Sequence, residues 1–211
     1  MELNEPFIWT GHPPHPPKSK RSGSSFPRLL LKVILFIVIS FLSIHLPDLS
    51  REIRSREQAL HEIIGILEKH SKDMDEGTKR ELAGAIYEES LRYNHDPKFI
   101  LALIAIESSF QNQSISERGA KGLMQLMPYV AESIAQELGI EWKGDPTLFN
   151  PSLNITMGIH YLSQLILDFN DIRVAMAAYN YGPTYVKGLI ERKQRIPAHY
   201  YHRVITVYQT L

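Results

Sequence analysis

Hydrophobic positions follow two patterns along this chain. Residues 29–46 form a nearly uninterrupted apolar run in which Lys32 is the only charged residue. Beyond residue 50, apolar positions recur at three- and four-residue spacing, which is typical of amphipathic helices. Convincing alternation of apolar and polar positions, the pattern of a strand, does not occur. The chain is therefore predicted to be mainly α, with an apolar segment ahead of a multi-helix domain.

The apolar run is long enough to cross a membrane. As a helix, residues 29–46 would extend about 27 Å at ~1.5 Å per residue, close to the thickness of a bilayer core. A cleaved signal peptide and a buried core helix are the alternatives. Residues 45–49 lack the small-residue cleavage pattern of a signal peptide, and apolar character runs all round the helix, which favours a span.

The flanking residues predict the orientation of this helix. Basic residues gather before the run, so the positive-inside rule puts the N-terminal side in the cytoplasm. Residues 10–27 are rich in Pro, Ser, Lys and Gly and cannot bury enough apolar surface to order themselves. We therefore expect a disordered cytoplasmic tail over residues 1–28, a transmembrane anchor over residues 29–46, and residues 47–211 on the opposite side.

Capping signals divide the remainder into helices. Ser50 begins a helix to about residue 70, whose apolar stripe fits a stalk, a dimerising helix or a helix packed on the domain, the last being the default. A capping box at Thr78 begins the next. The expected later helices cover residues 78–93, 97–110, 128–138, 150–169, 171–179, 184–192 and 197–210. We assign residues 47–76 to a helical stalk or linker and residues 77–211 to the main domain.

Composition narrows the function classes. Lys and Arg balance Asp and Glu at 23 each, and the basic excess lies in the first 46 residues, so the main body is weakly acidic. Such a body argues against nucleic acid as a partner. The chain has no cysteine, which excludes disulfides and thiolate metal sites. The metalloprotease pattern begun by His61-Glu62 fails at Gly65, and His199 with His202 lacks a third ligand, so we expect no metal and no cofactor.

One carboxyl group is the main candidate for a catalytic role. The helix that begins at Pro97 is apolar nearly all round, and Glu107 near its end shares a face with Ile100 and Ile104. Loss of hydration and the helix C-terminus should both raise the pKa of this carboxyl group. A carboxyl group protonated near neutral pH is what a general acid requires. The alternative is a helix-end glutamate facing solvent, and this segment alone does not decide between them.

Three motifs follow one another in a recognisable order. They are Glu107-Ser108, then Gly122-Leu123-Met124-Gln125, then Ala178-Tyr179-Asn180-Tyr181-Gly182-Pro183. Together they resemble the lytic transglycosylases of the soluble-type SLT family, relatives of goose-type lysozyme, over roughly residues 85–207. The resemblance implies a lysozyme-like multi-helix catalytic domain. It also implies cleavage of the β-1,4 bond between N-acetylmuramic acid and N-acetylglucosamine in peptidoglycan.

The resemblance assigns roles to individual residues. It makes Glu107 the catalytic acid and base. The residues matched to substrate binding are Ser116, Gln125, Met127, Tyr179, Asn180 and Tyr200. Two positions depart from the family pattern: Tyr181 stands where an alanine is usual, and Ile196-Pro197 stands where glutamate-threonine is frequent.

No second carboxyl group lies in the motif set, so we expect the substrate to supply the nucleophile and to form 1,6-anhydromuramic ends without water. The alternatives are a lysozyme-type hydrolase of the same bond and a non-catalytic peptidoglycan-binding or assembly component. The expected partners are peptidoglycan strands, the inner membrane through residues 29–46 and a cell-envelope complex. The catalytic domain is expected on the periplasmic side.

Overall fold

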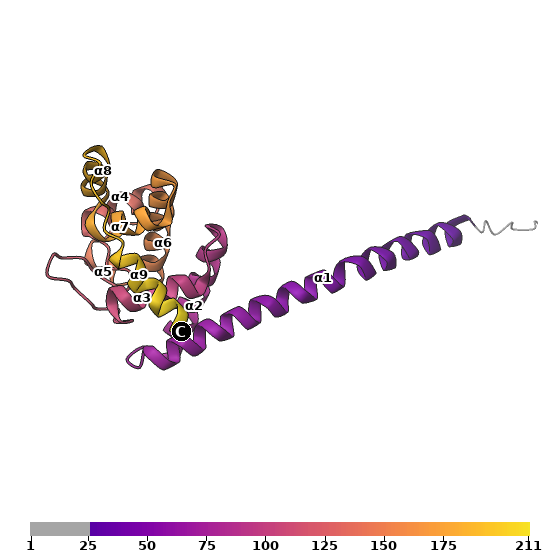
Figure 1. The fold of residues 1–211 in the computed structure, drawn as a ribbon. Coiled ribbons are helices and arrows are strands. Elements are labelled where there is room, and N and C mark those ends of the chain that lie inside the picture. The colour runs from indigo at the N-terminus through magenta and orange to yellow at the C-terminus, as the bar shows by residue number, and fades with distance from the viewer. Residues whose placement is uncertain (1–25) are drawn as a thin grey trace, which may run out of the picture. The chain divides into compact units, whose positions relative to one another are not determined.

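The computed structural model describes residues 26–211, without the side chains of residues 26–29, 42 and 44–48. This part of the chain forms nine α-helices and no strand, with isolated bridges only at Ile115–Lys121 and Lys121–Leu126 (Figure 1). The helices are α1 (Phe26–His70), α2 (Glu76–Arg92), α3 (Pro97–Ser108), α4 (Pro128–Leu138), α5 (Asp145–Leu148), α6 (Pro151–Phe169), α7 (Ile172–Tyr181), α8 (Pro183–Glu191) and α9 (His199–Thr210). The mainly α prediction is confirmed.

The chain divides at Ser50 into two compact units, and α1 runs through the division. In the first unit, large apolar side chains such as Leu31 and Phe36 are exposed. Within the described residues, no helix combines the length and the apolar character needed to cross a membrane, so the predicted span over residues 29–46 is not supported. The predicted disordered tail lies outside the described residues, except that residues 26–28 begin α1.

The second unit begins at Arg51, ahead of the domain boundary predicted at residue 77. The last turns of α1 explain this, because Ile63 and Leu67 are buried in the same core as Ile86 and Ile100. Burying a large aliphatic side chain contributes about 1.5–3 kcal/mol, so these turns are integral to the fold of this unit.

Local capping chemistry sets most helix boundaries. The side chain of Asp96 accepts a hydrogen bond from Lys98 N at 2.8 Å, and Asn150 and Asp171 cap α6 and α7 in the same way, so these three helices begin close to the positions expected from the sequence. The predicted capping box at Thr78 is wrong. Asp75 caps α2 instead, because its carboxylate accepts hydrogen bonds from both the backbone N–H and the hydroxyl of Thr78.

Other elements also differ from the sequence predictions. Helix α1 runs through Ser50, where a helix was expected to begin, and α7 extends to Tyr181 and not to residue 179. Helix α9 begins at His199 and not at residue 197, and the short helix α5 was not predicted. Helix α5 is a single turn, Asp145–Leu148, too short to generate a periodic apolar pattern.

Helix α3 lies at the centre of the second unit. Residues 99–104 are all buried, and α9 packs alongside α3 (Figure 1). Helix α6 packs against both α2 and α7. It also approaches the segment before α4 closely at Gly158, where a Cβ atom would lie 2.4 Å from Met124 Sδ. This packing holds the end of α3, the segment of residues 114–127 and the start of α9 in one region of the unit.

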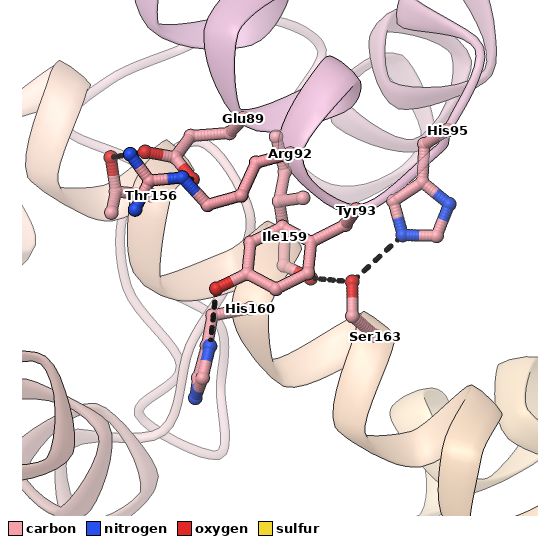
Figure 2. A network of polar contacts seen from close by, with 8 residues as sticks. All are labelled: Glu89, Arg92, Tyr93, His95, Thr156, Ile159, His160 and Ser163. Carbon is pink, nitrogen blue, oxygen red and sulfur yellow. Dashed lines mark hydrogen bonds and ion pairs between the residues drawn. The ribbon is translucent and has the colours of Figure 1, made fainter.

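Figure 2 shows a polar network between α2, the residues that follow it, and α6. The Tyr93 hydroxyl lies 2.7 Å from His160 Nδ1, and His95 Nε2 lies 2.8 Å from Ser163 Oγ. Ser163 donates its own proton to the Ile159 carbonyl at 2.7 Å, so His95 must donate to Ser163. Burial lowers the pKa of His95, which favours the neutral form of this histidine.

Candidate active site

Glu107 lies in the last turn of α3, where the chain leaves the core. The residue is partly exposed, yet protein atoms crowd its carboxyl group. Burial raises the pKa of Glu107 from the ordinary 4.5 to about 7, against the opposing effects of a hydrogen bond from Tyr200 and the positive charge of Arg203. A carboxyl group with this pKa is protonated in much of the population at neutral pH and can act as both acid and base.

Tyr200 is the direct partner of that carboxyl group. It lies in the first turn of α9, is only 1% exposed, and donates its hydroxyl proton to Glu107 Oε1. Burial, followed by the nearby charge of Glu107, raises the pKa of Tyr200 well above its ordinary value, so the hydroxyl keeps its proton. One carboxyl oxygen is therefore fixed by the protein, and Oε2 is the oxygen left for a reacting group.

Tyr179 links α7 to the same site. Its hydroxyl donates to the Met124 carbonyl at 2.8 Å, and its ring packs against Tyr161 at 5.5 Å between centroids. Burial is the main cause that raises the pKa of Tyr179, and the charge of Glu107 adds to it. The charge of Glu107 therefore affects the pKa of Tyr179, and the Tyr179 hydroxyl also holds the backbone next to Gln125.

Gln125 is held in an unusual conformation by its own segment. Its backbone has φ 50°, in the left-handed region, and its side-chain Nε2 donates to Ser114 O at 3.1 Å and Gly122 O at 2.8 Å. These two bonds use both amide protons, so Oε1 is the group available as an acceptor. The Ser116 hydroxyl, in the same segment, accepts from Ala120 N at 2.9 Å. The amide of Gln125 is therefore oriented before any ligand binds.

The remaining matched residues lie at helix ends. Met127 precedes α4 as its N-cap residue and is half-buried, and Asn180 is exposed in the last turn of α7. The structure therefore gathers Glu107, Tyr179 and Tyr200 directly. Ser116 and Gln125 belong to the segment that Tyr179 holds, whereas no described contact joins Met127 or Asn180 to Glu107.

Two residues contribute to the site without having been assigned a role from the sequence. Asn154, fully buried on α6, accepts from Met124 N at 2.8 Å and donates to Lys121 O at 3.2 Å and Leu148 O at 2.9 Å. Arg203 follows Tyr200 by one turn of α9, and its charge lowers the pKa of Glu107. A buried amide within the apolar helix α6 was a usable sequence signal, whereas the effect of Arg203 depends on tertiary packing.

The chemistry available here centres on one carboxyl group. The groups that influence the pKa of Glu107 beyond burial are Tyr200 and Arg203, and neither is an acid. Among residues 26–211, no cluster of three or more His, Asp or Glu side chains could hold a metal ion. The arrangement suits proton transfer by Glu107 with an oriented hydroxyl donor beside it.

Comparisons with known proteins identify the family of this chain. The family model described as transglycosylase SLT domain matches residues 84–201, more than half of the chain. An endo-type membrane-bound lytic murein transglycosylase A from Klebsiella pneumoniae is 45% identical over 74 residues, which are 33% of this chain and 36% of that protein. A soluble lytic murein transglycosylase from Salmonella typhimurium is 35% identical over 91 residues, which are 42% of this chain and 14% of that protein.

A solved structure is similar as well. The lytic transglycosylase Slt from Pseudomonas aeruginosa, crystallised as an inactive mutant, is 32% identical with a TM-score of 0.49, over 60% of this chain and 21% of that one. The chain thus spans about a third or less of the length of these relatives. Because the family model covers most of the second unit, from α2 to the start of α9, this chain belongs to the transglycosylase SLT domain family.

Proposed function

We propose that this protein is a peptidoglycan lytic transglycosylase, which cleaves the β-1,4 bond between N-acetylmuramic acid and N-acetylglucosamine and leaves 1,6-anhydromuramic ends. The observation that carries the proposal is the single carboxyl group of Glu107, whose pKa is raised to about 7 and which a buried tyrosine hydroxyl orients. Family membership and the names of the similar proteins support the same substrate.

In the first step, protonated Glu107 donates from Oε2 to the oxygen that links the two sugars. The bond from muramoyl C1 to that oxygen breaks, and the N-acetylglucosamine side leaves as an alcohol. Glu107 becomes a carboxylate. The Tyr200 hydroxyl and the charge of Arg203 both favour this ionised form, so they stabilise the charge that develops during the step.

The second step needs no second acid. Glycosidases that use two carboxyl groups hold them about 5–5.5 Å apart for retention or ~6.5–9.5 Å apart for inversion, and no acidic neighbour influences Glu107. The acetamido oxygen of the muramoyl sugar supports the cation-like C1. The C6 hydroxyl then attacks C1 while Glu107 takes its proton, which regenerates the acid and consumes no water.

The other matched residues are proposed to bind the glycan. Gln125 offers an oriented amide oxygen to a sugar N–H or hydroxyl, and Tyr179 keeps its backbone in place. Ser116, Met127 and Asn180 are proposed to complete the binding surface on either side of the cleaved bond.

We also propose that residues 29–46 attach the protein to the inner membrane, with the second unit in the periplasm. The support is the exposed apolar side chains described between residues 30 and 41, and a similar protein named as membrane-bound. A cell-envelope complex is a further proposed partner. Fractionation of cells expressing the protein, with and without residues 29–46, tests the attachment: equal release of both forms by salt would contradict it.

Digestion of purified sacculi with the full chain tests the function. Mass spectrometry of the products should show anhydro ends, each lighter by one water than the end a lysozyme-type hydrolase leaves. Glu107→Gln should abolish cleavage and retain binding to sacculi. Reducing ends in place of anhydro ends would favour the hydrolase alternative, and binding without cleavage by the wild-type protein would favour a non-catalytic binding component.

A further inference from the structure

A cavity of about 900 Å³ lies beside the segment that follows Glu107. One wall is the end of α1 and the link to α2, residues 69–75, and the opposite wall is residues 109–113, which leave the C-terminal end of α3. The first wall precedes residue 84, where the family match begins. This cavity is therefore built partly from a segment that the SLT domain match does not include.

Charged side chains of both signs line the cavity. Lys69, Lys72 and Asp73 belong to the first wall and are exposed, and none of the three makes an ion pair or side-chain hydrogen bond within the described residues. The neighbouring Asp75 is already engaged as the cap of α2. Two ammonium groups and one carboxylate are thus available to a ligand that carries the complementary charges.

Two buried polar atoms, one in each wall, also lack a protein partner. Ser71 is only 4% exposed, and neither its Oγ nor Asn112 Oδ1 has a hydrogen bond within the described residues. Asn112 is fixed in orientation, since its Nδ2 donates to Phe149 O at 2.7 Å. Leaving such buried atoms unpaired is costly, so a shift of the walls that let a ligand donor reach them would favour binding.

The cavity is connected directly to the turn after the catalytic helix. Ser109 and Phe110, both with positive φ, carry the chain away from Glu107. The His70 ring, from the last residue of α1, stacks on Phe110 with 5.5 Å between centroids and 25° between planes. A ligand in the cavity would contact the segment that holds Glu107 at the end of α3.

We propose that this cavity binds the short peptide that N-acetylmuramic acid carries on its lactyl group. The inference rests on the proposed function, since it takes peptidoglycan as the substrate. Such a peptide presents carboxylates and a free amine, which complement Lys69 and Lys72 on one side and Asp73 on the other. A sugar without a peptide fits the cavity less well. The aromatic rings of the cavity, His70 and Phe110, stack on each other and Phe110 is buried, so they do not offer a free face to a sugar ring.

Binding is tested by titrating the full chain with the free stem tripeptide L-Ala-γ-D-Glu-diaminopimelate, followed by calorimetry and by amide NMR shifts. We expect saturable binding that moves the resonances of Ser71 and Asn112. The double variant Lys69→Gln/Lys72→Gln should weaken it by about tenfold or more, since each charge-assisted hydrogen bond is worth roughly that factor. The matched control Lys143→Gln removes an exposed lysine outside the cavity and should bind as the wild type does.

Cleavage provides the second readout. The wild type should cleave peptide-bearing strands faster than bare strands, from which an amidase has removed the peptides. The double variant should cleave both kinds of strand at the rate at which the wild type cleaves bare strands. Saturable binding unaffected by the double variant, or no binding at millimolar tripeptide, overturns the proposal. If neither substrate is cleaved by the wild type but the tripeptide still binds in the cavity, the proposed function fails and the binding site stands.

Discussion

Removal of the Tyr200 hydroxyl tests how the protein controls its acid. In Tyr200→Phe the buried ring remains, and the hydrogen bond to Glu107 Oε1 is lost. That bond lowers the pKa of Glu107, so its loss should raise the pKa. A hydrogen bond to a charged group contributes about 1.5–3 kcal/mol. Because Glu107 is partly exposed, we take about 1.4 kcal/mol, which moves the pKa by about one pH unit, from about 7 to ~8.

The assay is the pH dependence of kcat/KM on purified glycan strands. The acid is lost as pH rises through the pKa of Glu107, so the alkaline limb of the profile should move upward by about one pH unit in Tyr200→Phe. The maximum should fall by about tenfold, since the carboxylate formed during bond cleavage loses its donor.

Tyr208→Phe is the matched control. This tyrosine lies on the same helix but donates to Asp96, at the opposite end of α3 from Glu107, so its profile should match that of the wild type. An alkaline limb that stays in place or moves downward in Tyr200→Phe would refute the electrostatic reasoning for this site.

Two further predictions concern stability. The pKa of Glu107 in the folded state is raised above its ordinary 4.5, so the native state loses stability as pH rises from about 4.5 to 7. Glu107→Gln lacks this titration and should be more stable than the wild type at pH 8, by about 1–2 kcal/mol after allowing for partial exposure. Near pH 4 the two proteins should be about equally stable. Thermal unfolding at both pH values checks this, and an equal difference at the two would contradict it. Gly122→Ala would place a Cβ 2.2 Å from Asn154 Nδ2 and 2.6 Å from Leu148 O, and should cost about 3 kcal/mol or more in urea unfolding. Gly119→Ala shares the positive φ but meets no atom within 4 Å, so it should cost only about 1 kcal/mol, and equal losses would show that backbone strain dominates at both positions.

Local chemistry explains why much of the fold was predictable. Asp96, Asn150 and Asp171 each cap a helix through a hydrogen bond that depends only on nearby residues, so the sequence alone predicts those boundaries. The start of α2 was mispredicted because two caps compete there, and Asp75 makes two hydrogen bonds with Thr78, the residue expected to be the cap.

The candidate site shows the same contrast between features that depend on nearby residues and features that depend on tertiary packing. The apolar helix α3 predicts a desolvated Glu107, and its pKa is indeed raised. Asn154 is a polar residue within the apolar helix α6, which the sequence shows, but its partner Met124 lies far away in the chain and could not be predicted. The effect of Arg203 on Glu107 depends on tertiary packing in the same way. The cavity beside Phe110 is likewise hidden from the sequence, since its two walls are separated by the whole of α2 and α3.

The pKa of Glu107 is the quantity on which catalysis by one carboxyl group depends. It can be measured in the full chain by ¹³C NMR titration of glutamate carboxyl resonances, with Glu107→Gln identifying the signal. We predict a midpoint of about 7. A midpoint near 4.5, the ordinary value of a solvated glutamate, would contradict the account.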